Sequence, residues 1–449
     1  FPTSQKIFCI VTKFKLNKLK EIDESLSGSI NSEVVWSTSM IKLPEFSLVL
    51  LDSIIQCTLN EREKENIASS SLNYLNPNNP TDKASLQVNK KEETNLVKSE
   101  SASEEHIVNS IAMEFLPLIA KSSSGNKLSN IQEWNSSQLM NSWSPDIISL
   151  NEEQEIEFSF QILNYSGYVK NINNDQMYDF LINLKQRYNQ NNNPFHNFTH
   201  GLSVLHSSAL FLNNLRAVVD NLDRATKFGF LIASLGHDVE HTGHNNNFEI
   251  MTRSKLALRY NDISPLEQHH ASTLLILLND YEILAGFTKE EQNTLRRVVI
   301  ECILSTDMKA HFSIISKLQD DNLDYQTILN ILLHASDISG STKNIDIAKF
   351  WTKRITDEFC DQYEEEIRMN ISPTEYFKDL YIDANIYKSE IQFLTIIVIP
   401  LFKEIKQHIF DKEKISPSES KMHFKSDNIN DIINQAEFNL QYYFKKLNP

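Results

Sequence analysis

Apolar residues recur at intervals of three and four positions from about residue 130 to the end of the chain. This spacing is typical of amphipathic α-helices, in which one buried face repeats every 3.6 residues. The clearest segments are MYDFLINLKQRY (177–188), SVLHSSALFLNNL (203–215), KFGFLIASL (227–235), LRRVVIECIL (295–304) and YQTILNILLHA (325–335). No alternation of strand and turn signals accompanies them. The pattern therefore predicts a compact all-α domain of about 16 helices.

Two other patterns precede this domain. Residues 1–60 carry short apolar runs separated by polar residues, and we interpret them as an N-terminal segment of unknown role. Residues 61–129 are rich in Asn, Ser, Lys and Glu, which is typical of a low-complexity, partly disordered linker. This linker contains one short predicted helix at 108–120. The helical domain is expected to occupy 130–449.

Charge and composition exclude some functions. The net charge of −16 argues against a nucleic-acid groove, which needs clustered Lys and Arg. An acidic protein can still bind a phosphate ligand when metal ions supply the local positive charge. The four cysteines are scattered without metal-binding or disulfide spacing, so we expect reduced thiols and a cytoplasmic domain.

The sequence shows no membrane-spanning segment. No stretch reaches the roughly 18 apolar residues that a transmembrane helix needs, and no secretory signal is visible. The chain begins at Phe1, and we interpret it as a processed or excised fragment. The full-length protein could then be attached to a membrane through a segment outside this chain. The sequence leaves the oligomeric state open.

The segment HDVEHTGHNNNF at 237–248 carries the most informative polar residues. On a helix, His237 and His241 would share one face because they are four positions apart. Asp238 lies beside them, and the preceding run LIASLG would bury the group. Imidazole and carboxylate groups are ligands of zinc and of harder divalent cations. A buried carboxylate needs a cation or hydrogen bonds.

Two further segments carry the same residue types next to apolar helices. His196 and His200 stand four positions apart in PFHNFTHG, and Asp337 follows the run ILNILLHA. Three such segments in one chain predict a shared metal centre.

The spacing His-Asp-x2-His-x4-Asn, from His237 to Asn246, resembles the signature of class I 3',5'-cyclic nucleotide phosphodiesterases. Other blocks similar to that family follow in the family's order: PFHNFTH at 194, YNDISPLEQHH at 260, STDM at 305, SDIS with TK at 336, WTKRITDEFCDQYEEE at 351 and SEIQFL at 389. The resemblance covers residues from about 130 to 445. It implies an all-α metallohydrolase that converts a cyclic nucleotide to the 5'-nucleoside monophosphate.

The resemblance also implies two divalent metal ions. Four residues would hold a first ion, zinc: His200, His237, Asp238 and Asp337. Asp238 would bridge to a second ion, magnesium or manganese. Three residues would hold the waters of that ion: His241, Glu267 and Thr306. A hydroxide between the ions is the expected nucleophile, and His196 is the expected general acid for the departing 3' oxygen.

Several residues of these blocks have simpler interpretations. His241 could cap its own helix, and Asp307 could be an ordinary helix-cap carboxylate. His269 and His270 are expected to orient the fold instead of binding metal. The glutamate run at 364–366 is interpreted as a solvated face.

The chain departs from the family at the positions that recognise the base. The family has a glutamine three residues before a phenylalanine that stacks on the purine. Phe393 matches that phenylalanine, but Glu390 stands at the glutamine position. Gly340 replaces an asparagine found in members that prefer cAMP. The candidate nucleotide-binding residues are Ile338, Glu390, Gln392 and Phe393.

The glutamate at this position changes the expected substrate. An ionised carboxylate only accepts hydrogen bonds, whereas an amide can also donate them. Guanine offers N1–H and N2–H as paired donors, and adenine presents an unprotonated N1 that a carboxylate would repel. The sequence therefore predicts that cGMP is favoured over cAMP. Protonation of Glu390 in an apolar pocket, or base reading by Gln392, would remove this preference.

Two other functions fit part of the pattern. A His-Asp metal phosphohydrolase acting on another nucleotide would keep the metal ligands but need not keep Phe393 or the block at 351. A non-catalytic cyclic-nucleotide-binding module would be expected to lose a metal ligand or the general acid, and both are present. Hydrolysis of a 3',5'-cyclic nucleotide accounts for more of the residues than either alternative.

Overall fold

The computed structural model describes residue 139 and residues 142–165, 172–320, 323–411 and 429–448. All of them belong to one compact unit, Glu133–Pro449. The segments predicted at 1–60 and 61–129, including the short helix at 108–120, lie outside the described residues. The domain boundaries given above therefore stay predictions.

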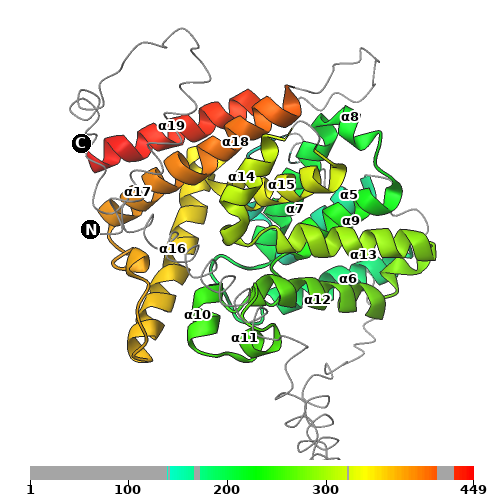
Figure 1. The fold of residues 1–449 in the computed structure, drawn as a ribbon, viewed down its shortest axis with the longest axis horizontal. Helices are drawn as coiled ribbons and strands as arrows, with labels where there is room; N and C mark the ends of the chain where they lie inside the picture. Colours follow the sequence, from blue (N-terminus) through cyan, green and yellow to red (C-terminus); the bar gives the residue numbers. More distant parts are fainter. Residues whose placement is uncertain (1–138, 140–141, 166–171, 321–322, 412–428, 449) are drawn as a thin grey trace, which may run out of the picture. The chain divides into compact units, whose positions relative to one another are not determined.

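The described part of the chain contains helices and no strand, so the prediction of an all-α domain is confirmed (Figure 1). The α-helices are α5 (Glu152–Tyr165), α6 (Asn174–Tyr188), α7 (Phe198–Asn214), α8 (Arg216–Val219), α9 (Arg224–Gly236), α10 (Asn246–Met251), α11 (Lys255–Arg259), α12 (Pro265–Asp280), α13 (Lys289–Leu304), α14 (His311–Leu318), α15 (Tyr325–Asp337), α16 (Ile345–Arg368), α17 (Asp383–Gln392), α18 (Ile399–Ile405) and α19 (Ile429–Leu447). Short 3-10 turns are η1 (Ile147–Ser149), η2 (Ile283–Gly286), η3 (Met308–Ala310), η4 (Ile338–Thr342) and η5 (Glu375–Phe377). Within the described ranges, none of the helices combines the length and apolar character needed to cross a membrane.

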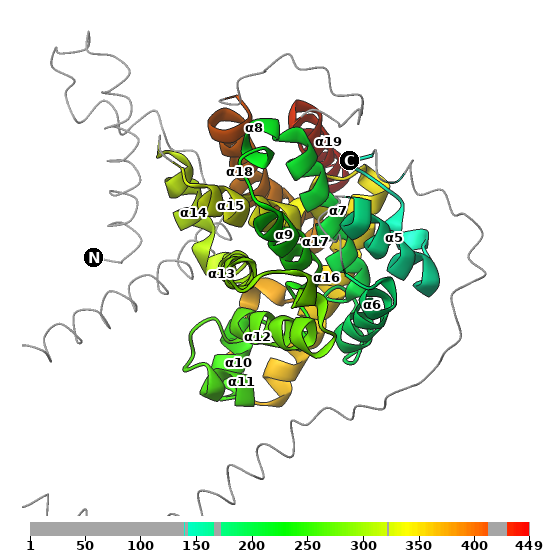
Figure 2. The ribbon, with the colours of Figure 1, turned by 90° about the vertical axis from the view of Figure 1, so that its right-hand side faces the viewer.

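Helix α9 lies at the centre of the core. All of its residues from position 228 to 236 are buried. It packs against α7 and α13, and α15 contacts both α7 and α9 (Figure 2). A helix that is apolar on all sides needs neighbours on all sides, and these three helices provide them.

Helix ends bring the predicted metal ligands to one place. Asn197 starts α7, because its side chain accepts a hydrogen bond from the backbone N–H of His200 (3.2 Å). His200 therefore lies in the first turn of α7. Helix α9 ends directly before His237, and α15 ends at Asp337. Since α7, α9 and α15 pack on one another, these three ends meet.

The C-terminal part contains one long, irregular helical rod. Helix α17, the π-helical turn η6 (Phe393–Val398), α18 and a second π-helical turn, η7 (Lys406–Phe410), follow one another without a break. Helix α19 lies along α17 and α18 (Figure 1). The turn η4, which follows the metal-side end of α15, packs against η6 and α16. This chain of contacts connects the site at Asp337 with Phe393.

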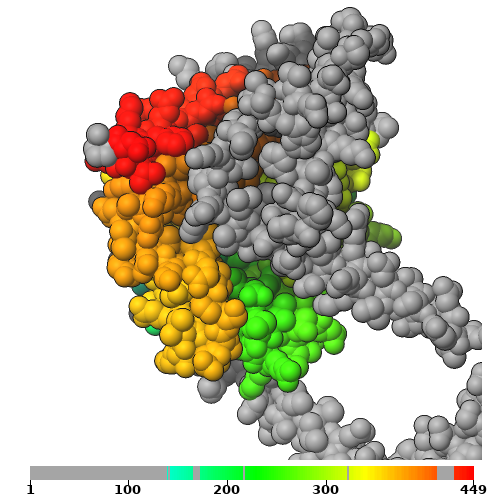
Figure 3. Space-filling view, turned by 60° about the vertical axis from the view of Figure 1, so that its left-hand side comes forward, coloured from blue at the N-terminus to red at the C-terminus, as the bar shows by residue number. Residues whose placement is uncertain are grey.

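The prediction that the run at 364–366 is solvated is wrong for one of its residues. Glu364 is exposed, but Glu366 is buried. Glu366 accepts hydrogen bonds from the backbone N–H (2.5 Å) and hydroxyl (2.8 Å) of Thr374 and from the Gln362 amide (2.8 Å). Gln362 and Glu366 are both buried. Positions four apart share one face of a helix, so Glu366 lies on the core-facing side of α16. Figure 3 shows this end of α16, in yellow and orange, beside α10 and α11 in green.

The close approach of α7 and α9 at Gly201 can be tested. A Cβ atom at Gly201 would lie 2.7 Å from the Leu235 carbonyl oxygen and 3.0 Å from the Tyr188 hydroxyl. Gly201→Ala is therefore expected to lower the free energy of unfolding by about 1–3 kcal/mol, measured by chemical denaturation. The control is Gly340→Ala, where the new Cβ would meet Trp351 at an ordinary 3.5 Å. Equal losses in the two variants would contradict this account.

Candidate active site

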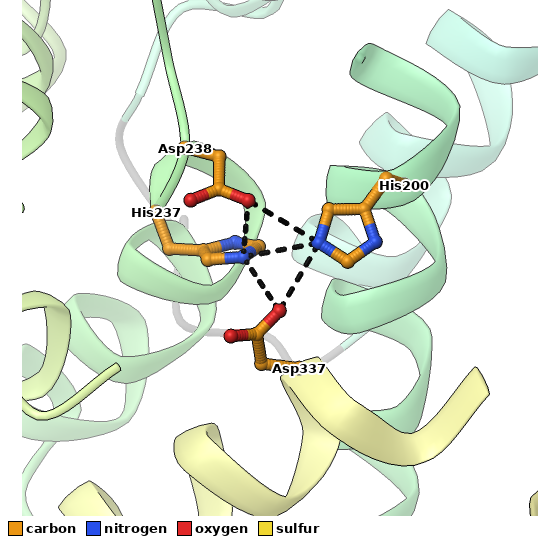
Figure 4. A group of neighbouring side chains, drawn as sticks. All are labelled: His200, His237, Asp238 and Asp337. Carbon is orange, nitrogen blue, oxygen red and sulfur yellow. Dashed lines mark hydrogen bonds and ion pairs between the residues drawn. The ribbon is translucent and has the colours of Figure 1, made fainter. Parts of the chain in front are cut away.

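Four side chains from the ends of three packed helices meet at one point (Figure 4). They are His200, His237, Asp238 and Asp337, and one donor atom of each lies within 4.8 Å of the others. Asp337 Oδ1 lies 3.1 Å from the Nε2 atoms of both histidines. Asp238 Oδ2 lies 3.0 Å from His237 Nε2 and 3.3 Å from His200 Nε2. The structure thus brings together all four residues predicted to share a cation.

Hydrogen bonds orient two of these donors. His237 Nδ1 lies 3.0 Å from the carbonyl oxygen of Ser234, so this nitrogen carries a proton and donates it. Its Nε2 then faces the centre of the cluster, where it can give a lone pair to a cation in place of a proton. The Tyr188 hydroxyl accepts from the backbone N–H of Asp238 (3.0 Å) and donates to the Leu235 carbonyl (2.9 Å). These two bonds fix the turn that follows α9.

The donor set fits a divalent cation. Two imidazole nitrogens and two carboxylate oxygens point toward one another in a buried place, with His237 entirely enclosed. Burial lowers the pKa of His237, but Asp238 and Asp337 hold this pKa well above its ordinary value. The carboxylates therefore require positive charge at this point, which a divalent ion would supply.

A further acidic group lies beside the four donors. Burial raises the pKa of Glu267 to about 8, and the carboxylates of Asp307 and Asp238 contribute to the increase. Asn246 orients Glu267 by donating to both of its carboxylate oxygens (3.1 and 2.9 Å). His270 Nε2 is buried without a hydrogen-bond partner among the described atoms, 3.8 Å from Asp238 Oδ1. The neighbouring carboxyl groups of Glu267, Asp307 and Asp238 are a suitable environment for a second cation.

His196 lies next to the cluster without belonging to the group of four. Its ring stacks on His241, with centroids 3.7 Å apart. Its Nδ1 is hydrogen-bonded to Glu358 Oε1. Glu358 Oε2 accepts from the backbone N–H groups of Phe195 (2.9 Å) and His196 (3.1 Å). Burial lowers the pKa of His196, but the carboxylate of Glu358, with further contributions from Asp238 and Asp337, raises it to about 9. This environment favours the protonated imidazole at neutral pH.

The other predicted residues near the metal cluster are also buried. His241 Nδ1 accepts from the backbone N–H of Gly243 (3.0 Å), and His241 forms a second cluster of candidate ligands with Asp238 and His270. The Thr306 hydroxyl donates to the Ile303 carbonyl (2.8 Å), which leaves its oxygen lone pairs able to accept.

Three of the simpler interpretations agree with hydrogen bonds in the structure. Asp307 caps η3 by accepting from the Lys309 backbone N–H (2.9 Å). His269 Nε2 bonds to Glu240 Oε2 (2.8 Å). His270 Nδ1 donates to the Val239 carbonyl (2.7 Å), but His270 also belongs to the candidate ligand group with Asp238 and His241, so its exclusion from metal binding stays a prediction.

Sequence reasoning missed Glu358 and Glu240. Glu358 lies on the core-facing side of α16. A glutamate among the inward-facing positions of this helix was the sequence feature that could have indicated its role. Glu240 has a positive φ of 62° and pairs with Arg187 Nη1 (2.5 Å) and His269. Burial raises the pKa of Glu240, but its bonds to His269 and Arg187 lower it below its ordinary value. These bonds hold the turn between Asp238 and His241.

The predicted nucleotide-binding residues lie on elements that pack together. Ile338 follows Asp337 and opens η4, which packs against η6. Phe393 opens η6 and is partly buried. Glu390 is buried on α17, and Gln392 Oε1 has no hydrogen-bond partner among the described atoms.

The fold and the site define a helical domain whose histidine and aspartate side chains can hold divalent metal ions. Residues 195–418 match the family described as 3'5'-cyclic nucleotide phosphodiesterase. The matching blocks make the domain a member of the class I 3',5'-cyclic nucleotide phosphodiesterase family, as the sequence predicted.

Named relatives agree with this assignment. The "Probable 3',5'-cyclic phosphodiesterase pde-1" of Caenorhabditis elegans is 32% identical over 271 residues, which are 58% of this chain and 40% of the relative. The "Dual specificity calcium/calmodulin-dependent 3',5'-cyclic nucleotide phosphodiesterase 1B" of Mus musculus is 33% identical over 276 residues, 58% of this chain and 50% of the relative. The "Dual 3',5'-cyclic-AMP and -GMP phosphodiesterase beta" of Plasmodium falciparum (isolate 3D7) is 32% identical over 295 residues, 62% and 25% of the two chains. The chain therefore spans half or less of the length of these relatives.

A solved structure supports the same fold. The phosphodiesterase domain of the RhoPDE fusion protein from the choanoflagellate Salpingoeca rosetta aligns with a TM-score of 0.62 and 25% identity. The alignment covers 70% of this chain and 96% of that domain. The helical arrangement is therefore that of a phosphodiesterase domain.

Metal binding by the four donors can be measured through stability. Adding Zn²⁺ to chelator-treated protein is expected to stabilise it by about 2.7 kcal/mol at a free concentration of about 100 Kd. Asp337→Ala should lose most of this gain because one of four donors is removed. Thermal denaturation with and without metal measures both effects. The exposed Asp346 provides the control Asp346→Ala, and an equal gain in the two variants would count against the site.

Proposed function

We propose that this domain hydrolyses a 3',5'-cyclic nucleotide to the 5'-nucleoside monophosphate, with cGMP favoured over cAMP. The observation that carries the proposal is the position of His196, which is hydrogen-bonded to Glu358 and stacked on His241 beside a buried cluster of four metal-type donors. The family match and the names of the relatives support the same reaction. A cytoplasmic location for the domain stays a prediction.

We assign zinc to the four-donor cluster, because two imidazoles with two carboxylates suit that ion. We assign magnesium or manganese to a second position that shares Asp238. His241, Glu267 and Thr306 would hold that ion through waters. When bound, the two ions would neutralise charge on the phosphoryl oxygens and lower the pKa of the attacking water.

His196 and Glu358 control the proton transfer of the proposed reaction. Hydrolysis forms a bond from a water oxygen to phosphorus and breaks the bond from phosphorus to O3'. The departing O3' needs a proton, which His196 donates. Glu358 holds His196 through Nδ1 and keeps it charged, so the other ring nitrogen is the donor. A proton released from the water restores His196 over the cycle.

Base recognition would occur where η4 and η6 pack together. Phe393 would stack on the purine, and Ile338 and Gln392 would lie against the nucleotide. An ionised Glu390 would accept the N1–H and N2–H donors of guanine, which supports the preference for cGMP.

The proposed reaction can be tested directly with both nucleotides. The metal-loaded chain is expected to release 5'-monophosphate from cGMP and cAMP, with the larger kcat/KM for cGMP. A chelator should abolish both reactions, and added Zn²⁺ and Mg²⁺ should restore them, as followed by chromatography. Failure to hydrolyse either nucleotide would reject the proposed function. A larger kcat/KM for cAMP would reject only the preference.

The roles of His196 and Glu358 can be separated by their pH profiles. His196→Gln should lower kcat by about 10²–10⁴-fold while the bound metal stays unchanged. Glu358→Gln keeps the imidazole but removes the carboxylate that contributes most to its raised pKa. Since His196 acts in its protonated form, the loss of activity at alkaline pH should begin at a lower pH in Glu358→Gln.

The matched control is Glu365→Gln, a partly exposed glutamate on the same helix. Its kcat–pH profile should match that of the unmodified chain. An unshifted profile in Glu358→Gln would show that Glu358 does not hold the proton on His196.

A further inference from the structure

The carboxyl group of Glu390 is buried, and the described part of the chain places no compensating cation beside it. Glu390 is 7% exposed, and its Oε2 atom has no hydrogen-bond partner among the described atoms. The groups that face it are hydroxyls from three elements: Thr352 of α16, Tyr376 of η5 and Tyr443 of α19. None of these three groups carries a positive charge at neutral pH. An ionised carboxylate in such surroundings is costly.

These hydroxyls are already engaged with other groups. Thr352 Oγ1 donates to the Ala348 carbonyl (2.9 Å) and lies 3.3 Å from the Tyr443 hydroxyl. The Tyr376 hydroxyl pairs with Ser389 Oγ at 2.6 Å. They can therefore stabilise an ionised Glu390 only weakly. Burial raises the pKa of Glu390 to about 7, and the Thr352 hydroxyl opposes the increase.

The two protonation states of Glu390 offer different hydrogen bonds. The ionised carboxylate has only acceptors, whereas the protonated acid has one O–H donor and one free acceptor. Guanine presents two donors along N1 and N2, which match the ionised form. Adenine presents an acceptor at N1 and a donor at N6, which match the protonated form. Each purine therefore suits one state of the same side chain.

We propose that Glu390 makes the choice of purine depend on pH, the ionised form selecting the guanine nucleotide and the protonated form accepting the adenine nucleotide. This inference rests on the proposed hydrolysis of cyclic nucleotides. It refines the cGMP preference: that preference is strong in alkaline solution and weakens as the solution becomes acidic.

The test is the ratio of kcat/KM for cGMP to kcat/KM for cAMP, measured with the metal-loaded chain as a function of pH. Ionisations of His196 and of the metal cluster affect both substrates and largely cancel in this ratio. The ratio is expected to rise by up to about tenfold per pH unit. The reason is that cGMP requires the ionised form of Glu390, whereas cAMP requires the protonated form. A ratio independent of pH, with both nucleotides hydrolysed, would overturn the inference and leave the proposed function intact. Hydrolysis of neither would reject the proposed function itself.

Variants assign the effect to one side chain. Glu390→Gln should make the ratio independent of pH, because an amide does not titrate in this range. Thr352→Val removes the hydroxyl that favours ionisation, so the rise of the ratio should move to higher pH. Gln392→Leu should keep the pH dependence, and so should the surface control Glu437→Gln. A rise that persists in Glu390→Gln, or that disappears in Gln392→Leu, would assign base reading elsewhere and overturn the inference.

Discussion

The contact between α7 and α9 is the constraint on which the rest of this domain depends. Gly201 allows the backbone of α7 to approach the Leu235 carbonyl, and the Tyr188 hydroxyl bonds to that same carbonyl. His200 precedes Gly201 by one residue, and His237 follows Leu235 by two. The packing that stabilises the core therefore also determines the spacing of the two imidazoles. The two histidines of the cluster are therefore positioned by the packing of these two helices, and α15 adds Asp337.

The periodicity of apolar residues was sufficient for the helical fold. The runs at 177–188, 203–215, 227–235, 295–304 and 325–335 lie in α-helices of the structure, except for Leu215, which follows the end of α7. The four donors could also be predicted, because each stands at an end of a strongly apolar helix. Such helices must be buried, and burial leaves few explanations for a histidine or an aspartate at their ends.

The polar residues that orient the site were harder to predict. Glu358 bonds to His196 and Phe195, which are 162 and 163 residues away in the chain. Glu240 depends on Arg187, which lies 53 residues earlier, and on a backbone with positive φ. Local patterns carry no information about such distant partners. The run at 364–366 failed for a different reason: Glu366 accepts hydrogen bonds from Gln362, one turn earlier on the same helix, and from Thr374, in the segment after the helix.

The π-helical turn that begins at Phe393 determines how α18 is rotated relative to α17. Such a turn accommodates one residue more than a regular turn. Since each residue advances an α-helix by about 100°, losing a single residue there would rotate α18 by that angle relative to Glu390. Phe402, which packs against Trp143, would then face a different neighbour. Substitutions along this rod leave the orientation of α18 unchanged, whereas a deletion or an insertion would rotate α18 about its axis.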